Sequence, residues 1–215
     1  MIEILRKIIK DTKKDITSIV VVILPLIAFI IIKISMAFLT VFKNYALVLD
    51  VIESIFITVC VSLIISLFII NSKIKKINKC LIVNYLVSFI YIFIILLILN
   101  LSKLSFLNIL FLSLSESAVG IILVMLTISY ANSKESAIKM MSLSSVFVLA
   151  NILPLLIPGS NNLSLSFVPT LWIGKYLYNG YFVFILWFVM ILAIWLLLLF
   201  IKFKLSQRNI QNHHN

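Results

Sequence analysis

The sequence has few charged residues and few of the residue types that build disulfide frameworks. Only 12% of its 215 residues are charged and 63% are hydrophobic, whereas soluble domains have about 25% charged and about 45–50% apolar residues. This composition excludes a water-soluble globular protein and a disordered chain. The only two cysteines, Cys60 and Cys80, lie inside or beside apolar runs, so we expect no disulfide framework.

Motifs that carry catalysis or metal binding are also missing. The sequence contains no His-Glu-x-x-His, no Gly-x-Ser-x-Gly, no Walker loop and no paired metal-ligand motif. The two histidines, His213 and His214, stand in a polar tail. We therefore expect no enzymatic activity and no cofactor or metal in this chain.

Long apolar runs fill most of the sequence. A membrane helix needs about 20 apolar residues, and a membrane β-barrel needs an alternation of apolar and polar residues that these runs lack. The sequence therefore predicts an all-α polytopic membrane protein with six transmembrane helices. The six predicted spans are Thr17–Phe38, Val51–Ile70, Cys80–Leu99, Leu104–Ser129, Met140–Ile157 and Tyr181–Ile201.

Basic residues predict the orientation of these spans. Five precede the first span, four lie between the second and third, two between the fourth and fifth, and three follow the sixth, which makes 14 of the 18 Lys and Arg. The positive-inside rule then predicts that both termini are cytoplasmic, in a bacterial plasma membrane. The net charge of +11 follows from this topology and favours anionic membrane lipids as partners. No folded aqueous face is predicted that would bind nucleic acid.

The N-terminal segment, residues 1–15, predicts a cytoplasmic amphipathic helix. Met1, Leu5, Ile8 and Ile9 share one face, and most basic residues lie opposite. Such a helix lies in the membrane interface, although an alternative is that it only anchors the first span. The chain is predicted to be a single transmembrane domain over 1–215, with a six-helix membrane part over 16–203 and a cytoplasmic tail over 204–215.

A few polar residues fall within the predicted spans, where ionisable groups are costly. In the fourth span, Ser113, Glu116, Ser117 and Gly120 share one helix face. They either line a cargo or proton path, or form a packing face in which a protonated Glu116 is hydrogen-bonded to a neighbouring helix.

The second span carries a similar stripe that includes Ser62, with Ser54, Thr58 and Ser66 at intervals of four residues. Packing is the favoured interpretation of this stripe. Asp50 and Glu53 lie near the outer end of the same span, where we expect water to solvate them.

The longest polar connection, Pro158–Gly180, joins the fifth and sixth predicted spans on the outer side. Its aromatic residues are typical of a membrane interface. Pro169-Thr170-Leu171-Trp172 predicts a turn followed by a short helix that lies on, or dips into, the outer leaflet. The segment is therefore a possible re-entrant element.

The order of these features resembles the permease subunits of ABC-2 type transporters. In that family an amphipathic helix leads into six spans, a short cytoplasmic connection after the second span docks on the ATPase, and a partly re-entrant segment precedes the sixth. Short local matches point to the permeases that are described as fluoroquinolone or multidrug exporters. They are Asp15-Ile16-Thr17 with Ile23-Leu24-Pro25-Leu26, Tyr130-Ala131-Asn132-Ser133-Lys134-Glu135-Ser136-Ala137-Ile138-Lys139, Asn151-Ile152-Leu153-Pro154 and Phe167-Val168-Pro169-Thr170-Leu171-Trp172.

The resemblance implies a dimeric export permease without an ATPase of its own. The second permease is another copy or a paralogue, and separate ATP-binding cassette subunits supply ATP hydrolysis with their own ATP and Mg. The cargo is amphipathic, such as a drug, a peptide or a lipid-like molecule. The implied ATPase contact lies in Asn71–Lys79, with candidate coupling residues Lys73, Ile74, Lys76 and Ile77.

Two alternative functions remain open from the sequence. One is the substrate-binding membrane module of an importer, which also has about six helices. The other is a bacteriocin immunity membrane protein that does not transport anything.

Overall fold

A computed structural model describes residues 2–12, 16–38, 45–72, 77–99, 101–131, 133–157 and 165–212. Within these residues every regular element is a helix and no strand occurs. The predicted all-α fold is therefore confirmed.

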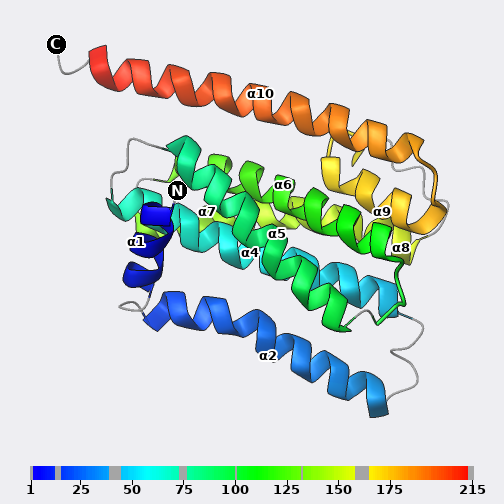
Figure 1. The fold of residues 1–215 in the computed structure, drawn as a ribbon. Coiled ribbons are helices and arrows are strands. Elements are labelled where there is room, and N and C mark those ends of the chain that lie inside the picture. The colour runs from blue at the N-terminus through cyan, green and yellow to red at the C-terminus, as the bar shows by residue number, and fades with distance from the viewer. Residues whose placement is uncertain are drawn as a thin grey trace.

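Helix α6 (Phe106–Tyr130) occupies the centre of the bundle (Figure 1). It packs against α4 (Ala46–Ser72), α5 (Ile77–Leu99) and α7 (Lys134–Val148). The hydroxyl of Ser105 accepts a hydrogen bond from the Asn108 backbone amide and caps the N-terminus of α6. Side chains on α4 and α6 are mostly buried, whereas much of the α5 surface is exposed and apolar.

Two long helices flank this bundle on opposite sides (Figure 1). Helix α2 (Ile16–Phe38) packs on α4, and α10 (Val183–Asn212) packs on α6 and on α9 (Pro169–Asn179). Both helices expose many large apolar side chains. A contiguous apolar exterior of this kind requires an apolar surrounding rather than water.

Four of the described helices are long and apolar enough to cross a membrane. They are Ala46–Ser72, Ile77–Ile98, Phe106–Tyr130 and Val183–Lys204, which coincide with the second, third, fourth and sixth predicted spans. Helix α2 covers the first predicted span. The four helices indicate a multi-pass membrane protein.

The fifth predicted span, Met140–Ile157, is not one continuous helix. Helix α7 starts earlier, at Lys134, and ends at Val148; it is followed by the 3-10 turn η1 (Leu149–Asn151) and the short α8 (Leu153–Leu156). Pro154 lacks the amide hydrogen that a helix interior needs and lies in the first turn of α8, where that donor is not required. The prediction is therefore corrected to a broken helix whose interruption directs Asn151 into the protein.

Helix α9 packs closely on this interruption. The first half of α9, from Pro169 to Gly174, is buried. A Cβ atom at Gly174 would lie 1.9 Å from the carbonyl oxygen of Asn151, so only glycine permits this approach. The indole of Trp195 on α10 donates a hydrogen bond to the carbonyl of Phe167, with a length of 2.8 Å. A helix thus follows Pro169 as the sequence predicts, and the residues 158–164 that precede it lie outside the described part.

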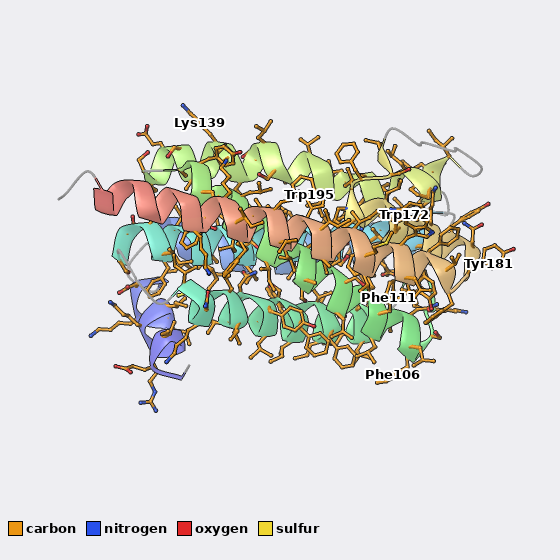
Figure 2. The ribbon with its side chains drawn as sticks, turned by 90° about the horizontal axis from the view of Figure 1, so that it is seen from above. Phe106, Phe111, Lys139, Trp172, Tyr181 and Trp195 are labelled. Atoms are coloured by element: carbon orange, nitrogen blue, oxygen red, sulfur yellow. The ribbon has the colours of Figure 1, made fainter. Side chains whose placement is uncertain are left out.

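The two ends of the bundle differ in composition. Helix α1 (Ile2–Thr12), Lys139 and the C-terminal part of α10 lie at one end, and Phe106 and Tyr181 lie at the other (Figure 2). We call the first the basic end, because α1 carries Arg6, Lys7 and Lys10 and the C-terminal part of α10 carries Lys202 and Lys204. Helix α1 contacts α2, α4 and α5 at this end, with Ile8 buried and the Lys7 ammonium 6.0 Å from the ring centre of Phe68.

We expect the basic end to face the cytoplasm. Lys139→Cys and Tyr181→Cys place exposed thiols at opposite ends, and the native Cys60 and Cys80 are buried, so their background reaction is low. A membrane-impermeant thiol reagent applied to intact cells should label Tyr181→Cys and should label Lys139→Cys only after the cells are opened. The reverse pattern would contradict the predicted orientation.

Candidate functional site

Most polar side chains of α4 turn toward the protein interior. Ser54, Thr58, Ser62 and Ser66 recur every fourth residue and are fully buried. Thr58 and Ser66 donate to the carbonyls of Ser54 and Ser62, at 2.9 and 2.7 Å, within their own helix. Ser62 differs, because its hydroxyl donates to the carbonyl of Gly120 on α6, at 3.2 Å. Ser62 therefore joins two helices, while the others satisfy themselves locally.

At Gly120, helices α4, α5 and α6 approach one another closely. A Cβ atom there would lie 3.0 Å from the amide nitrogen of Asn84, 3.0 Å from the hydroxyl of Ser62 and 3.3 Å from the methyl of Thr58. Small residues allow such approach between membrane helices. We call Thr58, Ser62, Asn84 and Gly120 the polar seam.

Asn84 is the unexpected member of the polar seam. Its side chain is fully buried, and neither its oxygen nor its nitrogen meets a hydrogen-bond partner among the described residues. The hydroxyl of Ser88, one turn further along α5, is also buried without a hydrogen-bond partner among the described residues. An unpaired buried amide or hydroxyl costs about 1–3 kcal/mol, so this arrangement requires a reason other than packing.

Glu116 lies one turn before Gly120 on the same face of α6 and is fully buried. The side-chain amide of Asn151 donates to its Oε1 atom at 2.5 Å. Within the described part of the chain, Oε2 of Glu116 and Oδ1 of Asn151 have no hydrogen-bond partner. Because the carbonyl of Asn151 also meets Gly174, Glu116 is connected through η1 to α9.

The other predicted residues of this face behave differently. The hydroxyls of Ser113 and Ser117 donate to the carbonyls of Ile109 and Ser113, at 2.8 and 2.6 Å, within α6. Both residues are buried, but they do not bond to Glu116 or to another helix through these hydrogen bonds. Of the four candidates, Glu116 and Ser62 are the ones that the structure links to neighbouring elements.

The expectation that water solvates Asp50 and Glu53 is wrong. Both are buried. The carboxylate of Asp50 accepts hydrogen bonds from the backbone amides of Leu101 and Ser102, at 3.2 and 2.9 Å, and from the Ser102 hydroxyl at 2.5 Å. Asp50 therefore fixes the connection between α5 and α6, which the sequence did not indicate because the partners are distant along the chain.

The candidate coupling residues lie between α4 and α5. Lys73, Ile74 and Lys76 fall outside the described residues, so only Ile77 can be placed. Ile77 begins α5, is half-buried and packs against the main hydrophobic core. Across the residues that the structure describes, no three His, Cys, Asp or Glu side chains gather in a way that would hold a metal ion.

Comparison with protein-family models, curated proteins and solved structures found no match to this chain. The evidence on the activity of the chain therefore comes from the geometry of its buried polar residues. This geometry provides a buried polar seam between three membrane helices and, one turn away, a carboxyl group linked to a broken helix. Several polar groups thus lie between helices that are long and apolar enough to cross a membrane.

The link between Glu116 and Asn151 can be tested by a double-mutant cycle. Asn151→Ala removes the donor and leaves a buried carboxyl unpaired, so we expect it to destabilise the protein by about 1–3 kcal/mol. Glu116→Gln keeps a carbonyl acceptor and should be milder, and Ser117→Ala, which removes only a bond inside α6, is the control. The stability is measured by thermal denaturation in detergent.

Each single change, Glu116→Leu or Asn151→Ala, leaves the other polar side chain buried without its partner. The double variant removes both polar groups, so its loss of stability should be smaller than the sum of the two single losses. Strictly additive effects would show that the two side chains do not stabilise each other.

Proposed function

We propose that this chain is the membrane-spanning permease subunit of an ABC transporter of the ABC-2 type. It exports an amphipathic cargo with ATP hydrolysed by a separate subunit. The observation that carries the proposal is the polar seam, where Asn84 is buried without a hydrogen-bond partner among the described residues. Buried polar groups in proteins are nearly always paired. The unpaired amide of Asn84 therefore favours a path in which a polar group of the cargo binds, over a surface that serves only helix packing.

The position of α1 gives the second line of support. This helix contacts α4 and α5 at the basic end, and α4 and α5 carry Ser62 and Asn84 of the polar seam. A partner that binds α1 and the connection between α4 and α5 therefore acts on the two helices that border the seam. In this proposal ATP-binding cassette subunits dock there, holding their own ATP and Mg.

The proposal assigns six spans to the chain, with α2 as the first and the broken α7, η1 and α8 as the fifth. Helix α9 is then a re-entrant element that enters the outer leaflet and packs on the interruption at Asn151. Both termini face the cytoplasm of a bacterial cell. Six helices are too few to enclose a path, so a second copy or a paralogue completes it.

During transport, closure of the ATP-bound subunits pushes on α1 and on the connection after α4. The Ser62 hydroxyl donates a hydrogen bond to the Gly120 carbonyl, and a relative movement of α4 and α6 breaks this bond. Ser62 and Asn84 are then free to bond to the cargo. Glu116 holds α6 to η1 through Asn151, so the movement of α6 is passed to α9 on the opposite side of the membrane.

The coupling step is tested with the double variant Ile74→Asp with Ile77→Asp. All lysines of the connection stay in place, so the topology should be preserved. We expect an ATP-binding subunit to co-purify with the wild-type chain and to be lost from the double variant, along with cargo-stimulated ATP hydrolysis. Ile138→Asp is the matched control, since Ile138 is exposed on α7 beside Lys139 at the basic end.

Retention of the partner and normal turnover in the double variant would show that the connection is only a topological signal. If no ATP-binding subunit co-purifies with the wild-type chain, the transporter proposal itself fails. An importer module or an immunity protein would then be the better description.

A further inference from the structure

An apolar groove of about 500 Å³ opens between α5, α6 and α10. This volume falls in the range of about 300–1,000 Å³ that is typical of ligand sites. Apolar side chains such as Leu81, Met125, Leu197 and Phe200 line it, and Asn78 stands at its basic end. The groove is separate from the polar seam, because none of the seam residues lines it.

The length of the groove matches one leaflet of a bilayer. On α10 its lining extends from Ala193 to Phe203, which at 1.5 Å per residue is about 15 Å. The hydrocarbon core of a membrane is about 30 Å thick, so the groove covers about half of it. It runs from the middle of the membrane helices to the basic end, where α5 begins and α10 continues beyond the bundle (Figure 1).

Three lysines lie within a few residues of the groove lining at the basic end. The Lys204 ammonium lies 5.0 Å from the ring centre of Phe200, itself a lining residue. The Lys202 ammonium lies 3.1 Å from the ring centre of Tyr130, two residues beyond the lining residue Ile128. Lys79 is exposed and follows Asn78. No acidic residue lines the groove, so its mouth is positively charged next to an apolar channel.

We propose that this groove binds an anionic phospholipid from the leaflet at the basic end. One acyl chain fills the groove, and the phosphate group lies between Lys79 on α5 and Lys202 and Lys204 on α10. Charge complementarity selects this occupant, since lysines near a membrane surface attract anionic headgroups and their long side chains extend toward the interface. The proposal does not depend on the transporter function.

The lipid would also have a structural role. The middle of α10 exposes much of its surface, and the groove separates part of the helix from α5 and α6. An acyl chain in the groove supplies the apolar contacts that this part of α10 otherwise lacks. Loss of the lipid should therefore lower the melting temperature of the chain as well as its lipid content.

The test uses the full chain purified in detergent, with phosphatidylglycerol and phosphatidylcholine of identical acyl chains as probes. Bound lipid is counted by native mass spectrometry, and the melting temperature is recorded for each lipid. Ala193→Phe fills the groove, and Ile194→Phe is its control, because Ile194 is exposed on α10 outside the lining. Lys79→Gln with Lys204→Gln removes two charges at the mouth, with the exposed pair Lys10→Gln and Lys139→Gln as its charge-matched control.

We expect about one tightly bound phosphatidylglycerol per chain and a higher melting temperature with that lipid than with phosphatidylcholine. Removal of the two lysines should weaken binding by roughly 10- to 30-fold, and Ala193→Phe should abolish it, while both controls bind normally. If Ala193→Phe does not fold, the lysine variants decide the question.

Three results would overturn the proposal. Equal retention of the two lipids would remove the role of the lysines. Unchanged binding to Ala193→Phe would remove the role of the groove. Conversion of a dimer to a monomer by Ala193→Phe, with the lipid content unchanged, would show that a second copy of the chain covers the groove instead.

Discussion

The burial of polar side chains inside an otherwise apolar bundle is the constraint on which the rest of the structure depends. In hydrocarbon a polar group has no water to bond to, so the polar faces of α4, α5 and α6 must turn toward one another. Gly120 makes this possible, because its missing side chain leaves room for Ser62, Thr58 and Asn84. The apolar faces that remain, on α2, α5 and α10, form the exterior. The exterior is thus apolar, and the buried polar side chains lie inside beside a large apolar core.

Much of the helical framework was predictable from the sequence, since four of the predicted spans coincide with long apolar helices. The spacing of Ser113, Glu116, Ser117 and Gly120 placed them on one face, and that face is buried. The partner of Glu116 was not predictable, because Asn151 reaches it through an interruption that a hydropathy pattern does not reveal. Asn84 was missed as well. The only sign of Asn84 in the sequence is that it is a single amide within a long apolar run. Its role depends on which helices surround it, and the sequence does not show this.

A series of contacts connects the basic end of the bundle to α9. At the basic end, α1 contacts α4 and α5. In the interior, Ser62 on α4 donates a hydrogen bond to α6. Asn151 of η1 bonds to Glu116 on α6 and also lies against α9. Two of these steps are hydrogen bonds between side chains or backbone groups of different elements. The large apolar core stabilises the bundle and offsets the cost of burying Asn84, which has no hydrogen-bond partner among the described residues.

In the proposed transport cycle, the polar seam opens when ATP is bound. Ser62→Cys, with Cys60 and Cys80 replaced by alanine, places one thiol in the seam, and its reaction with a small water-soluble thiol reagent is followed in native membranes. Ile90→Cys, on the exposed face of α5, is the lipid-facing control. We predict slow modification of Ser62→Cys at rest and clearly faster modification when ATP is supplied, with no change in the control. An equal rate with and without ATP would contradict it, because the seam would then be a permanent packing surface.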